Sequence, residues 1–172
     1  YTAYVFSMIV CGFGQGMAPL ASFVYGAKEK LLARNLFTRT VLLVLAAGCA
    51  TVAFVGFGSG WYSRIFVSDT AVQQMIKSGI LIFMWDFVLC GFNAIASFYF
   101  TSIGKAKESA VISSARGLVI LLAAIFVLPA LFGMNGVWLT SPATEILTLA
   151  ITLFYLKKDR TEIGSAKPAE KM

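Results

Sequence analysis

Two carboxylic acids, Asp86 and Glu145, lie inside long apolar stretches of the sequence, where charged side chains are rare. An acid at the centre of a membrane-spanning helix costs roughly 2.5 to 3.5 kcal/mol on insertion scales, so such residues face the protein interior and often mark transport pathways. A carboxyl group in that position could exchange a proton or bind a cation. We therefore take Asp86 and Glu145 as candidate coupling residues for an ion or a proton.

Each acid belongs to a stripe of polar residues that recur three or four positions apart. The first stripe consists of Asp86, Cys90, Asn93, Ser97 and Thr101, and the second consists of Ser141, Glu145, Thr148 and Thr152. Residues with this spacing share one face of a helix, so both stripes should turn away from lipid. They either form hydrogen bonds between helices or line a cavity, and for Asn93 and Ser97 we carry both interpretations.

The apolar stretches that hold these stripes predict an all-α, polytopic membrane fold. Each is roughly 20 residues or longer, which is enough to cross the hydrocarbon core as a helix. The expected transmembrane domain covers residues 1–156, and a polar cytoplasmic tail over residues 157–172 is expected to be disordered. The five predicted helices cover residues 1–24, 41–60, 78–103, 110–132 and 137–156.

The basic residues predict the orientation of these helices. One face of the membrane should carry Lys28, Lys30, Arg34, Arg39, Lys105, Lys107, Arg116, Lys157, Lys158, Arg160, Lys167 and Lys171, and the other only Arg64 and Lys77. The positive-inside rule therefore places the C-terminus in the cytoplasm. Asp86 and Glu145 then reach a similar depth in the outer half of the membrane, and Arg116 is expected to extend to the cytoplasmic headgroups.

Composition argues against several functional classes. The chain has no His, and its three Cys residues show no paired or metal-ligand spacing, so we expect no metal site, no cofactor and no enzyme activity. The net charge of +6 is explained by loops beside anionic lipid headgroups, so no nucleic-acid partner is expected.

Small residues crowd the first predicted helix. Gly12, Gly14, Gly16 and Pro19 surround Gln15, so this helix can approach a neighbour closely and should loosen at the proline. Broken helices of this kind often border binding sites in transporters. Gln15 and Pro19 are therefore candidates for a substrate cavity, with a simple packing and kink site as the alternative.

Several short motifs resemble the multidrug and toxic compound extrusion (MATE) transporters. The run Gly12-Phe-Gly-Gln-Gly-Met-Ala-Pro19 and the following Tyr25-Gly-Ala-Lys28 resemble a helix of that family and the loop after it. Two later runs, Ser102-Ile-Gly-Lys105 and Asn135-Gly-Val-Trp-Leu139, resemble a later loop and the start of the last helix. The resemblance covers about Tyr1 to Lys158.

The resemblance implies twelve helices in two six-helix lobes, of which this chain would supply the last five. The N-terminal lobe and the first helix of the C-terminal lobe would then belong to the missing part of the protein. Some branches of the family carry an aspartate that would fall near Phe92 or Asn93 here, so Asp86 is not assigned by analogy.

The predicted function is a secondary multidrug exporter of the inner membrane, which exchanges sodium ions or protons for small organic cations. Asn93, Ser97 and Tyr99 would line its cavity with Gln15 and Pro19, and aromatic rings could stack on flat cations. Two alternatives remain open. A lipid-linked saccharide flippase would favour basic residues in the cavity, whereas a non-transporting membrane partner or scaffold would need no buried acids.

Overall fold

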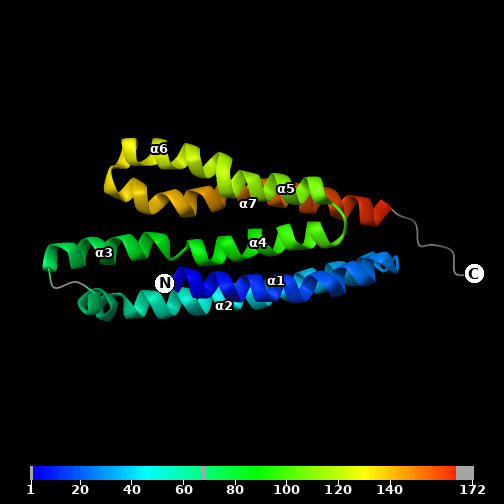
Figure 1. Cartoon of the computed structure of the whole chain (residues 1–172), viewed down its shortest axis with the longest axis horizontal. Coiled ribbons are helices and arrows are strands. Elements are labelled where there is room, and N and C mark those ends of the chain that lie inside the picture. The colour runs from blue at the N-terminus through cyan, green and yellow to red at the C-terminus, as the bar shows by residue number, and fades with distance from the viewer. Residues whose placement is uncertain (1, 67–68, 166–172) are drawn as a thin grey trace, which may run out of the picture.

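The computed structural model describes residues 2–66 and 69–165, and it is a bundle of long helices that run side by side (Figure 1). Within these residues, five segments are long and apolar enough to cross a membrane: Thr2–Gly26, Lys30–Gly58, Val72–Ser102, Ala106–Phe132 and Met134–Ile163. The predicted all-α, multi-pass membrane fold is therefore confirmed. The connections α1–α2 and α4–α5 and the end of α7 lie at one end of the bundle, as the alternating basic segments predicted (Figure 1).

The first two spans are α1 (Thr2–Gly26) and α2 (Lys30–Phe66). Helix α1 continues through Pro19 without a break. Helix α2 begins eleven residues before the predicted start at residue 41, because Lys, Leu, Ala and Arg in this stretch all favour a helix although they are not all apolar. Hydropathy marks the part of a helix that lies in lipid rather than the whole helix.

The third and fourth spans each contain an irregularity that the sequence analysis did not predict. The third divides into α3 (Thr70–Phe83) and α4 (Asp86–Ser102), with a turn at Met84 and Trp85. The fourth consists of α5 (Ala106–Ser114), a π-helical turn (Ala115–Val119) and α6 (Ile120–Phe132). Both irregularities lie next to ionisable residues, since α4 starts at Asp86 and the π-helical turn contains Arg116.

The last span is α7 (Met134–Ser165), which extends nine residues beyond the predicted end at residue 156. The prediction of a disordered tail from residue 157 is therefore wrong for residues 157–165, and the rest of that tail lies outside the described residues. Asp159 is only 3% exposed and forms an ion pair with Lys105 Nζ at 2.8 Å, while Glu162 bonds the same amine. These contacts explain why a polar segment stays helical here.

Lys105 is held in place by the end of α4. The N–H of Lys105 donates to the carbonyl of Phe100 (2.9 Å) and the N–H of Gly104 to that of Thr101 (3.2 Å), which is a Schellman motif with Gly104 at φ 80°. Burial alone would lower the pKa of Lys105, but its hydrogen bonds to Asp159 and Glu162 raise that pKa above the ordinary range. The glycine and lysine of this loop therefore join the end of α4 to α7.

Helix α4 is the centre of the bundle, with α1 and α2 on one side and α5 and α7 on the other (Figure 1). Its apolar residues pack against α1 and α2, and the buried core includes Phe6, Val10, Val44, Phe87, Ile95 and Phe100. Of the crowded glycines in α1, Gly14 makes the close approach, because a Cβ there would lie 2.3 Å from the ring of Phe98. The polar face of α4 contacts α7 instead.

Candidate functional site

Parts of the two polar stripes meet at the contact between α4 and α7, which agrees with the expectation that both stripes turn away from lipid. Asp86, at the first position of α4, is 8% exposed, and its Oδ1 accepts a hydrogen bond from the hydroxyl of Ser141 on α7 (2.9 Å). Further along the same interface, Asn93 is fully buried against Glu145. The structure therefore places both candidate acids in one interhelical contact.

Glu145 receives hydrogen bonds at both carboxylate oxygens. Its Oε1 accepts from Arg116 Nε at 3.0 Å and lies 2.9 Å from Arg116 Nη2, and its Oε2 accepts from Asn93 Nδ2 at 2.7 Å. Asn93 Nδ2 also donates to the backbone carbonyl of Glu145 (3.0 Å), so this side chain ties α4 to α7 directly. The Glu145 side chain is 7% exposed, and these donors replace the water that it has lost.

The prediction that Arg116 extends to the cytoplasmic headgroups is wrong, because its guanidinium turns inward to Glu145 and to Cys90. The fourth span starts at Ala106 rather than at residue 110, so Arg116 lies ten residues into the helix, about 15 Å from its start. The π-helical turn that contains Arg116 changes the direction of the side chains around it. Arg116 Nη2 also lies 3.0 Å from Cys90 Sγ, so Arg116 links α4, α7 and the turn before α6.

Ser97 takes part in a second polar contact, between α4 and α5, rather than in the contact with α7. Its hydroxyl lies 2.9 Å from that of Ser109 and 2.7 Å from that of Ser113, and Thr101 Oγ1 lies 2.7 Å from Ser109 Oγ. This network fits the interpretation of Ser97 as an interhelical hydrogen-bonding residue. Ser113 is exposed and lines the groove described below.

Tyr99 is fully buried, and its hydroxyl donates to Asp159 Oδ2 at 3.2 Å. Its ring packs against Phe37 and Phe100. The residue is therefore part of the core and of the junction between α4, the α4–α5 loop and α7. The structure does not bring it into contact with Asp86 or Glu145.

Gln15 and Pro19 lie on an exposed face of α1. The glycines beside them, Gly12 and Gly16, help to line a shallow groove against α2. Among the described residues nothing covers this face, so its suggested part in a substrate cavity stays a prediction.

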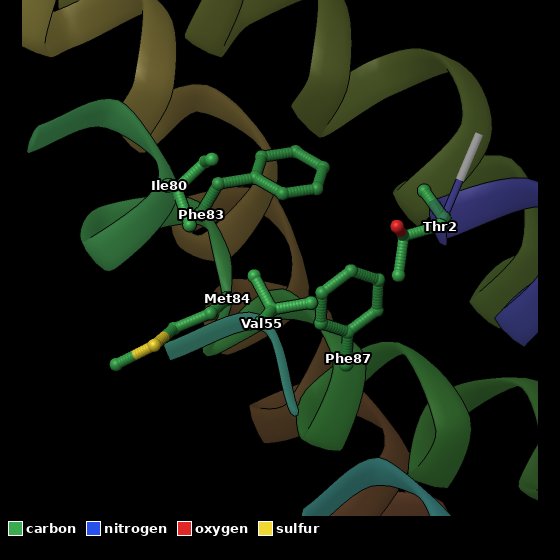
Figure 2. Close-up of a pocket in the computed structure, with 7 residues that line it drawn as sticks. Thr2, Val55, Ile80, Phe83, Met84 and Phe87 are labelled. Carbon is green, nitrogen blue, oxygen red and sulfur yellow. The ribbon is translucent and has the colours of Figure 1, made fainter. Parts of the chain in front are cut away.

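Two hollows adjoin the break between α3 and α4 and the π-helical turn. The first is an apolar cavity of about 180 Å³ at the break, and Figure 2 shows six of its lining residues: Thr2, Val55, Ile80, Phe83, Met84 and Phe87. The rings of Phe83 and Phe87 meet edge to face with centroids 6.0 Å apart. The second is a more open groove of about 430 Å³ beside α7, which is lined by Ser113, Arg116, Gly117, Ser141, Thr144 and Glu145.

The groove, unlike the apolar cavity, reaches the ionisable residues. It exposes Arg116, whose side chain is 25% accessible, and touches Ser141, the partner of Asp86. No three His, Cys, Asp or Glu side chains gather in a metal-binding arrangement within residues 2–66 and 69–165. The site is therefore two carboxylates at one interface, only one of which has a fixed positive partner.

Comparison with family models matches residues 2–127 to the MatE family. The chain belongs to this family. The match covers more than half of the chain, including the motifs up to Lys105, and it confirms the resemblance to the MATE transporters. MATE membership and the five membrane-spanning helices together make this a multi-pass membrane chain.

Three relatives carry the same name, multidrug export protein MepA. Those of Staphylococcus saprophyticus and Staphylococcus haemolyticus are each 24% identical to this MATE chain, over 165 and 166 residues, and one from Staphylococcus aureus is 22% identical over 170 residues. Each alignment covers 95% of this chain, which spans about 36% of the length of these relatives. No solved structure matches the chain.

Proposed function

We propose that this chain is the C-terminal lobe portion of a multidrug exporter that exchanges sodium ions or protons for organic cations. Asp86 would be the residue that takes up the coupling ion or proton. The relatives named as multidrug export proteins support the transport class. The remaining seven helices would come from the rest of the protein, in the inner membrane and with a cytoplasmic C-terminus.

The observation that carries this proposal is the contrast between the two buried acids. Glu145 has a guanidinium partner, whereas among the described residues Asp86 accepts its side-chain hydrogen bond from the neutral hydroxyl of Ser141. A buried carboxylate without a cation is unstable in apolar surroundings, so it favours a bound proton or a bound cation. Asp86 therefore has the chemistry of an exchange site.

The flippase alternative gains one observation, because a basic residue lines the groove after all. That residue, Arg116, has its charge balanced by Glu145, so it does not leave the groove positive. The remaining acid is Asp86, which favours cationic cargo over an anionic lipid-linked saccharide. A non-transporting scaffold needs no buried acid without a basic partner, so Asp86 argues against that alternative.

The test is dye efflux from cells or vesicles that contain the full-length protein. Asp86→Asn should abolish or strongly reduce efflux driven by an imposed ion gradient, while membrane insertion stays normal. Runs with a sodium gradient and with a proton gradient identify the coupling ion. The matched control is Glu29→Gln, which removes an exposed acid in the α1–α2 turn and should leave efflux unchanged. Normal efflux by a well-expressed Asp86→Asn protein would refute the assignment.

A further inference from the structure

The carboxylate of Glu145 is occupied by groups of the protein itself. Both of its oxygens accept hydrogen bonds, Oε1 from Nε of Arg116 and Oε2 from the amide of Asn93, and Nη2 of Arg116 lies 2.9 Å from Oε1. A guanidinium stays protonated at any physiological pH, and its planar donors fit a carboxylate closely. The guanidinium of Arg116 and the carboxylate of Glu145 therefore form an ion pair.

Contacts on several sides also fix the position of the Arg116 side chain. In this respect Arg116 differs from a flexible cation on the protein surface. Its Nη2 contacts Cys90 Sγ on α4 at 3.0 Å, and its backbone lies in the π-helical turn before α6. A cation from solution would have to displace a tethered guanidinium that already sits 2.9 Å from the carboxylate. Tethering gives the internal cation a large advantage in effective concentration.

The ionisable groups at this interface are few. Asp86, Cys90 and Glu145 face one another from α4 and α7, and Arg116 reaches them from the π-helical turn. The one cation among these four groups is paired to Glu145, and Asp86 is bonded to Ser141. The guanidinium therefore contacts Glu145 directly and reaches Asp86 only through longer-range electrostatics.

We propose that Arg116 is a built-in counter-cation that occupies the carboxylate of Glu145 and closes it to exchange, so that Asp86 alone takes up a cation or proton. In this arrangement Arg116 is a positioning residue that decides how many carboxylates of this lobe can exchange. The role given to Asp86 rests on the proposed function, but the pairing of Arg116 with Glu145 does not. Removal of the guanidinium should convert Glu145 into a second exchangeable acid.

The test labels buried acids chemically. Dicyclohexylcarbodiimide reacts with protonated carboxyl groups in apolar surroundings, and mass spectrometry of peptides identifies the modified residue. In the full-length wild-type protein we expect modification of Asp86 and not of Glu145. In Arg116→Gln we expect modification of Glu145 to rise by about tenfold or more, as for the loss of a charge-assisted hydrogen bond.

Two further variants serve as matched controls. Arg116→Lys keeps a cation, and Lys107→Gln removes an exposed basic residue near the start of α5, so Glu145 should stay unmodified in both. Modification of Glu145 in the wild-type protein to the same extent as Asp86 would overturn the proposal, even if Arg116→Gln fails to fold. So would an Arg116→Gln protein in which Asp86 reacts and Glu145 does not.

The labelling and the efflux measurements can fail independently. If Asp86→Asn transports normally while Glu145 becomes reactive only in Arg116→Gln, the proposed function is wrong and the role of Arg116 stands. If efflux depends on Asp86 while Glu145 reacts in the wild-type protein, the opposite holds.

Discussion

Substitution of Gly136 by Ala should push α6 and α7 apart. A Cβ at this position would lie 2.0 Å from the carbonyl oxygen of Leu128, 2.4 Å from its carbonyl carbon and 2.8 Å from the nitrogen of Pro129. Contacts between carbon and oxygen are normally about 3.3 Å or longer, so the backbones would have to separate by about 1.3 Å. The turn around Gly133, with φ 57°, is too short to absorb this shift.

Overpacking of this kind costs about 1 to 3 kcal/mol of stability. For a domain of 150 to 250 residues each kcal/mol lowers the melting temperature by about 2 to 4 °C, so in the longer full-length protein we expect a loss of at most roughly 12 °C. Because Ser141 and Glu145 lie one to three turns further along α7, the shift should also disturb their contacts with Asp86 and Arg116. Ion-coupled efflux should therefore fall together with stability.

The assay is thermal unfolding of the full-length protein in detergent, followed by size-exclusion chromatography with fluorescence detection. Gly26→Ala is the matched control, since a Cβ at Gly26 meets no atom of the described residues within 4 Å. Its melting temperature should equal that of the wild type. A Gly136→Ala protein that melts with the control would show that α6 and α7 do not pack as closely as described.

Two other changes test the contacts around α7. Ser141→Ala removes the hydroxyl that donates to Asp86 and should shift the coupling-ion concentration for half-maximal efflux by about tenfold, as for one hydrogen bond to a charged group, whereas Ser141→Thr should restore it. Lys105→Gln leaves the buried carboxylate of Asp159 without its ion-pair partner, so stability should fall by about 1 to 3 kcal/mol. Hydrogen exchange over residues 157–163 should accelerate in that variant, and unchanged exchange there would contradict the role of the ion pair.

Hydropathy and polar spacing predicted the parts of the fold that follow from lipid exposure. The five spans and the burial of Asp86 and Glu145 both follow from turning polar faces away from lipid. The sequence also predicted that Gly14 or a neighbour would allow close packing of α1, and Gly14 does so against Phe98. These features depend on periodicity, which a single sequence displays.

The ends of the helices and their irregular turns could not be predicted from hydropathy and periodicity. Hydropathy does not detect a helix that continues through a polar segment, so it does not predict the extension of α7 to Ser165. It also places span limits at the first apolar residue, which put Arg116 too close to the surface. One signal in the sequence could have indicated the position of Arg116. A single Arg and a single Glu lie within neighbouring predicted spans, and opposite charges in lipid surroundings could neutralise one another. The Gly104 turn that fixes where α5 starts was a second signal.

The π-helical turn at Ala115–Val119 makes the number of residues in this segment important for the direction of its side chains. In other members of the family, that number is as informative about the position of an arginine as the residue type itself. A π-helical turn holds one residue more than an α-helical turn, so the loss of one residue there would rotate the segment before it by about 100° relative to α6. In a relative with such a deletion, an arginine could be retained in the aligned position and still point away from Glu145. A one-residue gap in this turn would therefore indicate a different distribution of charge inside the lobe.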